Sequence, residues 1–159
     1  MKRTRSALQQ EIQQTRPFRS AAEEGVVGLF RTADHLRRLL CSVVEPGGIT
    51  LQQYNVLRIL RGAGTSGLPT LEIADRMIEQ APGVTRILDR MELKGLVSRE
   101  RCAEDRRQVL CYITGAGSAL LAALDEPMHG AARQAMAPLR AGDVRLLIRL
   151  MDALRTEAP

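Results

Sequence analysis

Arginine side chains gather between residues 86 and 107, where their spacing suits contact with nucleic-acid phosphates and base edges. A guanidinium group presents a rigid fork of N–H donors that matches a phosphate or the edge of guanine. The set comprises Arg86, Arg90, Arg99, Arg101, Arg106 and Arg107. Acidic residues are interspersed among them, so a solvated charged surface is the alternative. The secondary structure that carries the arginines distinguishes a nucleic-acid contact surface from a solvated charged surface.

The segment Val84–Lys94 has the pattern of an amphipathic helix. Its apolar residues recur at helical spacing and would share one face, while the opposite face is polar. The apolar residues are Val84, Leu88 and Met91, and the polar ones are Thr85, Arg86, Asp89 and Arg90. Lys94 and Gly95 end the helix as a cation in its last turn and a glycine C-cap.

A two-stranded hairpin should follow this helix. The hydrophobic period drops towards two in Val97–Cys102 and again in Gln108–Ile113. The residues between the two strands, 103–107, are polar and end in two arginines. We call the hairpin, residues 97–113, the wing, because a helix that leads into a hairpin with a basic tip is the outline of a winged helix.

Two helices are expected before Val84. Thr50–Gln53 has the spacing of a capping box and begins a helix that ends at Gly62. The glycine-rich connection Arg61–Pro69 is expected to be flexible, and Thr70 then caps a short helix. Two short helices joined by a tight polar turn and followed by a hairpin predict a winged helix-turn-helix.

Leucine-rich helices should flank this unit on both sides. One begins with a capping box at Ser20–Glu23 and stops at Pro46–Gly48. After the wing, Thr114 caps a long helix that Pro127 should kink or split. A final helix begins near Asp143, and its leucines at helical spacing include Leu147, Leu150 and Leu154. One small core needs fewer leucines, so we expect a dimer seam there; packing within the monomer is the alternative.

Residues 1–19 form a basic arm, with only one acidic residue, Glu11. The Gln-rich part Ser6–Thr15 could form a short helix before Pro17 interrupts it. The arm could contact the DNA backbone or clasp a dimer. A partly ordered, solvating tail is the alternative.

Composition favours a mainly helical protein. With 159 residues, 45% of them hydrophobic, the chain can bury the core of one domain and shows no sign of general disorder. Aromatic residues make up 3% and Trp is absent, so Leu, Val, Ile, Ala and Met must build the core, which favours helices. The net charge of +5 and the pI near 9.7 are compatible with an anionic partner.

This chain lacks the residues that are characteristic of several classes of protein. Cys41, Cys102 and Cys111 have no metal-like spacing and fit a reducing cytoplasm. With only His35 and His129, no Gly-rich phosphate loop and no nucleophile elbow, we expect no enzyme, metal or cofactor. No apolar run approaches the roughly 18 residues of a membrane span, and the basic N-terminus lacks the apolar core of a signal peptide. We therefore expect a cytoplasmic protein.

The wing and the helix before it resemble the MarR family of bacterial transcriptional regulators. In that family the recognition helix ends in the pattern LxxKGLVxR, present here as Met91–Arg99 with Met in the first position. The wing tip carries an acid-x-Arg element, matched by Asp105–Arg107. The strand leaving the wing enters a Leu-Thr-x-x-Gly helix start, present here as Ile113–Gly117 with Ile in the first position. The order and spacing of the helices agree over roughly Ser20–Thr156.

The resemblance implies a homodimer of winged helix-turn-helix lobes. Residues 20–49 and 114–159 would be the N- and C-terminal dimerisation helices, and residues 50–113 the DNA-binding lobe. Such dimers bind pseudo-palindromic double-stranded DNA operators and often release them when a small ligand or an oxidant acts. We therefore expect a sequence-specific transcriptional regulator, a ligand-responsive repressor. A winged-helix protein-interaction module without DNA specificity is the alternative from another class.

A recognition helix enters the major groove with its polar face towards base edges. Thr85 and Arg86 lie in its first turns, which enter deepest, so we expect them to contact bases. Arg90 lies one turn later and could reach a base or a phosphate. Asp89 should orient Arg86 or Arg90, because phosphates repel a carboxylate.

The wing arginines have separate expected roles. Arg107 would enter the minor groove, where narrow A·T tracts concentrate negative potential, and Asp105 would hold its guanidinium in a bidentate pair. Arg106 would bind the DNA backbone, and Arg99 lies lower on the hairpin as a further DNA contact.

The family resemblance also suggests a ligand cleft between the dimer helices and the lobe. His35, Cys41 and Tyr54 are candidates to line it, although each is more often a satisfied core or boundary residue. Cys41 could instead be a thiol switch; the oxidant-sensing branch of the family has its reactive cysteine near the start of the first long helix, where this chain has none. A disulfide between Cys102 and Cys111 is not expected, because the hairpin register should pair Cys111 with a residue nearer Arg99.

Overall fold

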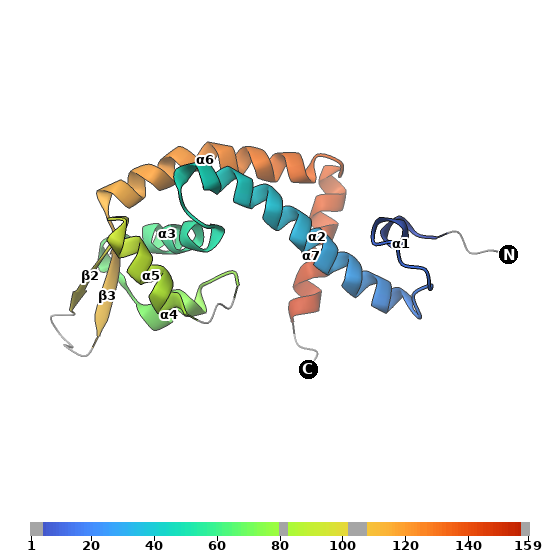
Figure 1. Cartoon of the computed structure of the whole chain (residues 1–159), viewed down its shortest axis with the longest axis horizontal. Coiled ribbons are helices and arrows are strands. Elements are labelled where there is room, and N and C mark those ends of the chain that lie inside the picture. The colour runs from blue at the N-terminus through green and yellow to red at the C-terminus, as the bar shows by residue number, and fades with distance from the viewer. Residues whose placement is uncertain (1–4, 80–82, 102–107, 157–159) are drawn as a thin grey trace. The chain divides into compact units, whose positions relative to one another are not determined.

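The structure, a computed structural model, describes residues 5–79, 83–101 and 108–156 (Figure 1). It confirms a mainly helical fold with a small antiparallel sheet. The elements are α1 (Ala7–Glu11), α2 (Ala21–Val44), a 3-10 turn (Glu45–Gly47), α3 (Leu51–Ala63), a second 3-10 turn (Gly64–Ser66), β1 (Leu68–Pro69), α4 (Thr70–Asp75), α5 (Val84–Leu93), β2 (Val97–Arg101), β3 (Val109–Ile113), α6 (Gly115–Met136) and α7 (Ala141–Arg155). The chain divides into two compact units, residues 1–39 and 40–159.

In the first unit, the described part of the N-terminal arm is folded. Ser6 begins α1 with a capping box, in which its Oγ accepts from Gln9 N at 3.3 Å and its own N donates to Gln9 Oε1 at 3.1 Å. Gln9 and Phe18 are buried, and Glu11 pairs with Arg31 of α2 at 2.8 Å. The short helix expected in the arm is present, and the arm contacts α2 through the Glu11–Arg31 pair.

The capping residues read from the sequence begin three longer helices. In each case a hydroxyl oxygen accepts a hydrogen bond from the backbone N–H three residues later. The bonds join Ser20 Oγ to Glu23 N at 3.1 Å, Thr50 Oγ1 to Gln53 N at 3.2 Å, and Thr114 Oγ1 to Gly117 N at 3.0 Å. Each cap satisfies an N–H that the helix itself cannot, and its loss typically costs about 1 kcal/mol.

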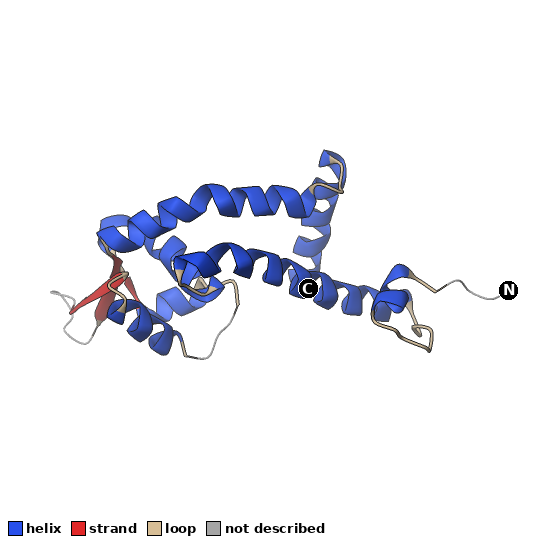
Figure 2. Cartoon of the chain, turned by 45° about the horizontal axis from the view of Figure 1, so that its top comes forward, coloured by secondary structure: helices blue, strands red, loops and turns tan. Residues whose placement is uncertain are grey.

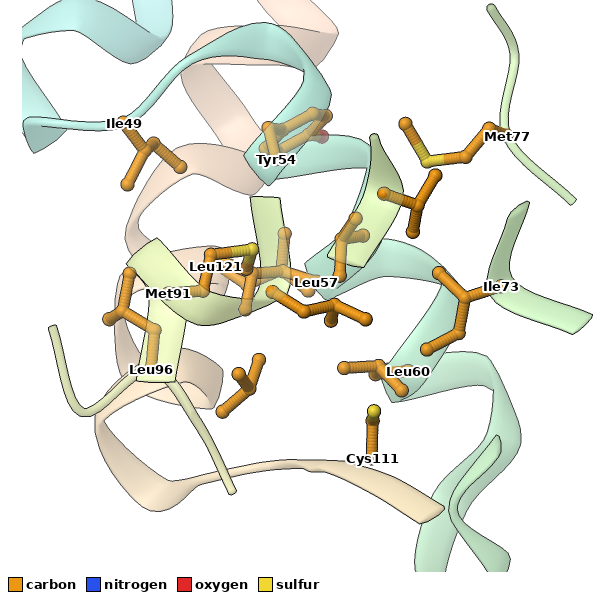
Figure 3. Close-up of a cluster of buried hydrophobic side chains, with 14 of the residues drawn as sticks. Ile49, Tyr54, Leu57, Leu60, Ile73, Met77, Met91, Leu96, Cys111 and Leu121 are labelled. Atoms are coloured by element: carbon orange, nitrogen blue, oxygen red, sulfur yellow. The ribbon is translucent and has the colours of Figure 1, made fainter. Parts of the chain in front are cut away.

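The second unit holds a hydrophobic core to which α3, α4, α5, the sheet and α6 contribute (Figure 3). Its largest fully buried side chains include Leu57, Leu60, Ile73, Leu88, Met91 and Leu121. The apolar face predicted for Val84–Lys94 is confirmed, because Val84 is 5% exposed and Leu88 and Met91 are 0% exposed. Burying each such side chain contributes about 1.5–3 kcal/mol. The core therefore fixes which face of α5 is turned to solvent.

The sheet contains the two wing strands and one strand that we did not expect (Figure 2). Its order is β1-β3-β2, and both pairings are antiparallel. Arg99 is paired with Cys111 in the β2–β3 ladder, so the expected register is confirmed. The connection expected to be flexible contains a 3-10 turn and β1, in which Leu68 pairs with Cys111.

One local prediction was wrong, and at Pro127 one of the two expected outcomes is excluded. Thr70 does not cap α4: Pro69 occupies the N-cap position, and the Thr70 hydroxyl lies 4.0 Å from the Cys111 sulfur instead. Pro127 does not split the helix after the wing, since α6 runs through it from Gly115 to Met136. Proline leaves the carbonyl four residues earlier without its helical donor. That residue, Ala123, and Pro127 itself are both exposed, so water can replace the missing donor.

Candidate nucleic-acid interface

Helix α5 turns a continuous polar surface to solvent. Thr85, Arg86, Asp89 and Arg90 are all exposed, on the side opposite its buried residues. Within the described part of the chain, neither Arg86 nor Arg90 forms an ion pair, so both guanidinium groups are available to an anionic partner. This is the arrangement that a recognition helix requires.

Two side chains anchor the C-terminal end of α5. Lys94 Nζ donates to Gly48 O at 2.6 Å, and Thr114 Oγ1 donates to Gly95 O at 2.7 Å. Gly95 has a φ of +68°, the left-handed conformation with which a helix commonly ends, as its place after Lys94 predicted. The end of α5 is thus tied both to the turn before α3 and to the start of α6.

Gly117 explains the glycine in the motif that follows the wing. An added Cβ at this position would overlap the carbonyl oxygen of Leu96 and lie 3.2 Å from Leu57 Cδ2. The same Leu96 carbonyl accepts a hydrogen bond from Thr114 N at 3.1 Å. The first turn of α6 therefore packs directly on the backbone that follows α5, at a distance only glycine allows.

Arg99 of β2 is turned towards α5. Its Nη2 donates to Asp89 Oδ1 at 2.7 Å. Asp89, which we expected to orient Arg86 or Arg90, instead pairs with this wing residue. Sequence reasoning missed the pair because the partners belong to different elements. The only signal available was an acid on the exposed side of the helix, ten residues before an arginine of the next strand.

The tip of the wing lies outside the described residues. The roles expected for Asp105, Arg106 and Arg107 therefore stay predictions, as does anything that involves Cys102. At the last described position of β2, Arg101 is exposed.

The three candidates for a ligand site have different surroundings. Tyr54 is 6% exposed and belongs to the lobe core (Figure 3). His35 is exposed in the first unit, and Cys41 is half-buried on α2. Cys111 is fully buried, and its burial raises the pKa of its thiol in spite of the nearby Thr70 hydroxyl and Arg99 charge. A ligand cleft stays a prediction.

Helix α7 has no buried residue. Several of its large apolar side chains are exposed: Leu146 at 44%, Ile148 at 49%, Leu150 at 55% and Leu154 at 69%. In the first unit, α2 exposes Phe30 at 75%. Helices with this much exposed apolar surface usually have a partner.

In the part of the chain that the structure describes, no three His, Cys, Asp or Glu side chains come together as a metal site. No described helix is both long and apolar enough to cross a membrane.

Comparison with known proteins gives a consistent result. A model of the MarR family matches residues 49–109. The homoprotocatechuate degradative operon repressor of Escherichia coli is 31% identical over 110 residues, which cover 69% of this chain and 73% of that protein. The crystal structure of a MarR transcription factor from Planctomyces limnophilus has 38% identity and a TM-score of 0.66, covering 86% of this chain and 99% of that one.

A second solved structure is a mutant MarR from E. coli complexed with operator DNA. It has 25% identity and a TM-score of 0.73, and the match covers 80% of this chain and 91% of that one. Three observations indicate the same family: the fold, the sequence of the junction at Lys94–Val97, and the extent of these matches. The chain belongs to the MarR family of transcriptional regulators.

Proposed function

We propose that this protein is a homodimeric, sequence-specific DNA-binding repressor that acts on a pseudo-palindromic operator and releases it when a small ligand binds. The observation that carries the proposal is the α5 surface, on which Thr85, Arg86 and Arg90 are exposed while the opposite face is held in the core. A regulator of this kind works where the bacterial chromosome lies, in the cytoplasm.

The recognition helix supplies the sequence readout. Thr85 and Arg86 occupy its first turn and would meet base edges in the major groove, where an arginine can bind guanine O6 and N7 together. Arg90 follows one turn later and reaches a base or a phosphate. Each good bidentate contact is worth about 1–3 kcal/mol of discrimination between bases.

The wing supplies the second contact. Arg107 enters the minor groove with Asp105 holding its guanidinium, and Arg106 binds the backbone. These assignments rest on the match of Asp105–Arg107 to the family motif.

Two copies of the lobe make the operator pseudo-palindromic. The exposed leucines of α7 support pairing of two chains through this helix. Half-sites on one face of the DNA would then lie about one helical turn, roughly ten base pairs, apart.

Repression and ligand release have indirect support. A relative of this chain is named an operon repressor. His35 and Cys41 remain candidate ligand contacts, whereas Tyr54, buried in the lobe core, would touch a ligand only at the edge of that core. The effector is unknown, and small phenolic or lipophilic ligands can be screened by thermal shift and then by operator release.

Fluorescence anisotropy with the DNA beside the protein's own gene tests the proposal. A dimer that contacts about six to ten phosphates should lose roughly 10³–10⁵ in affinity between 50 and 200 mM salt. Arg86→Ala should lower affinity for the operator more than for scrambled DNA, whereas Arg106→Ala should weaken both about equally.

No salt-dependent DNA binding by the wild type would contradict the proposal and favour the alternative, a winged-helix module that contacts another protein. Wild-type affinity in Arg107→Ala would reject the assignment of the wing alone.

A further inference from the structure

Arg99 joins the wing to the recognition helix. Its Nη2 donates to two acceptors of α5, Asp89 Oδ1 at 2.7 Å and the backbone carbonyl of Thr85 at 3.3 Å. Its Nε lies 3.7 Å from Glu92 Oε2. The three contacts run along the side of α5 that faces the wing, from its first turn to its last. This one side chain therefore contacts three residues of α5 that are spread over about two helical turns.

The Arg99 side chain is the least accessible member of this cluster. It is 21% exposed, against 51% for Asp89 and 44% for Glu92, and its cross-strand neighbour Cys111 is fully buried. Burial alone lowers the pKa of Arg99, but the hydrogen bond that Arg99 donates to Asp89 and the charges of Asp89 and Glu92 outweigh it and raise that pKa. The guanidinium is charged at neutral pH, and its Nη2 group donates to the helix.

Arg99 Nε is buried and has no hydrogen-bond partner among the described residues. The nearest carboxylate oxygen, at 3.7 Å, is too far for a hydrogen bond. Since this atom has almost no solvent-accessible surface, a phosphate cannot contact it in the described structure. The geometry thus separates Arg99 from Arg86 and Arg90, whose side chains are exposed.

Two consequences for DNA binding follow from this geometry. The carbonyl of Thr85 belongs to the first turn of α5, so Arg99 fixes the part of the helix that carries the base-contacting candidates Thr85 and Arg86. It also neutralises Asp89 and Glu92, whose charges would otherwise repel phosphates at the same surface.

We propose that Arg99 is a positioning residue for operator recognition: it holds the start of α5 on the wing and neutralises Asp89, and it does not itself contact DNA. The proposal replaces the direct contact expected from the sequence, and it rests on the proposed function.

The decisive readout is the salt dependence of DNA binding. Loss of an arginine that binds a phosphate weakens binding about equally on all sequences and reduces the slope of log K against log salt by about 1. Loss of a positioning residue leaves the slope unchanged and lowers the ratio of operator to scrambled affinity. We expect Arg99→Gln to lower that ratio about tenfold, comparable to the loss of one base contact.

The Asp89→Asn variant distinguishes the two roles of Arg99 by the direction in which operator affinity changes. If Arg99 positions α5, this variant loses operator affinity even though it removes a negative charge from the DNA-binding surface of the protein. If Arg99 binds phosphate, the same variant frees it and affinity rises or stays unchanged. In the double variant the two losses should not add, because they remove one interaction; the shortfall should be at least about fivefold.

Arg101→Gln is the matched control, since Arg101 lies two residues further along β2, on the same face, and is exposed. It should not change the ratio of operator to scrambled affinity. Thermal unfolding checks that each variant is folded at the assay temperature; if Arg99→Gln is not, the sign of the Asp89→Asn effect decides. If the wild-type protein does not bind DNA, the proposed function is rejected. If the wild-type protein binds DNA, this inference alone is overturned by either of two results: a lower salt slope in Arg99→Gln, or tighter operator binding by Asp89→Asn.

Discussion

Arg61 of α3 and Asp125 of α6 form a two-pronged ion pair, with Nη1 2.7 Å from Oδ2 and Nη2 3.0 Å from Oδ1. The hydrogen bond from Arg61 is the main reason that the pKa of Asp125 is lowered, and the same bond raises the pKa of Arg61. The pair connects α3 to α6, the long helix that follows the wing.

Removing the charge with Asp125→Asn should lower stability at neutral pH and matter less in acid. The folded pKa of Asp125 is below its unfolded value, so its contribution is present above the unfolded pKa and is lost as pH falls through the folded pKa. Urea denaturation at pH 7 and at about pH 3 should therefore give a difference from wild type that shrinks in acid. Glu126→Gln, at the next exposed position, is the control. An equal difference at both pH values would show that the charge of Asp125 is not responsible.

Gly117→Ala should destabilise the lobe. The new methyl group would overlap the Leu96 carbonyl, and overpacking of this kind typically costs about 1–3 kcal/mol. Gly115→Ala is the matched control: it lies two residues earlier in the same helix, where an added Cβ meets nothing within 4 Å. Guanidinium denaturation should show a lower midpoint for Gly117→Ala only. Equal midpoints for the two variants would mean that α6 shifts without cost.

Charges on α7 should separate the proposed dimer. Leu150→Asp combined with Leu154→Asp removes two exposed leucines, each worth about 1.5–3 kcal/mol if buried by a partner. The dimer dissociation constant should rise on the order of 100-fold or more, and light scattering should report a monomer at micromolar concentration. Leu93→Asp, at an 89% exposed leucine of α5, should leave the mass unchanged. A double variant that remains dimeric would place the interface elsewhere.

Cys111 should react slowly with iodoacetamide. Burial removes it from solvent and raises the pKa of its thiol, so at pH 8 it presents less of the reactive thiolate. In a Cys102→Ser background, mass spectrometry should find Cys41, which is half-buried, labelled first. Comparable labelling rates for the two thiols in folded protein would disagree with the burial of Cys111.

The sequence predicted the elements whose signals are local. The caps at Ser20, Thr50 and Thr114, the buried face of α5 and the hairpin register all follow from spacing within a few residues, and all are present. Strand β1 could not be predicted in this way. It is two residues long and includes a proline, and it exists because Leu68 pairs with a strand more than forty residues later.

The candidate site likewise has features that local sequence patterns predict and features that depend on tertiary packing. The exposure of Thr85, Arg86 and Arg90 follows from helical periodicity, so it could be predicted. The partner of Asp89 could not, because nearby Arg86 and Arg90 compete for it in the sequence, and only the packing of β2 beside α5 brings Arg99 closer. An arginine pattern predicts the charge of a surface, but the tertiary structure determines which of those arginines are bonded within the protein and which are exposed.

The anchored end of α5 has a consequence for how the family diversifies. Lys94, Gly95 and Gly117 hold the helix through contacts with the protein's own backbone, whereas Thr85, Arg86 and Arg90 point away from those contacts. Under the proposed function, substitutions at the outward positions would change the preferred operator without loss of the fold. Two proteins that share this junction can be close relatives and still regulate different genes.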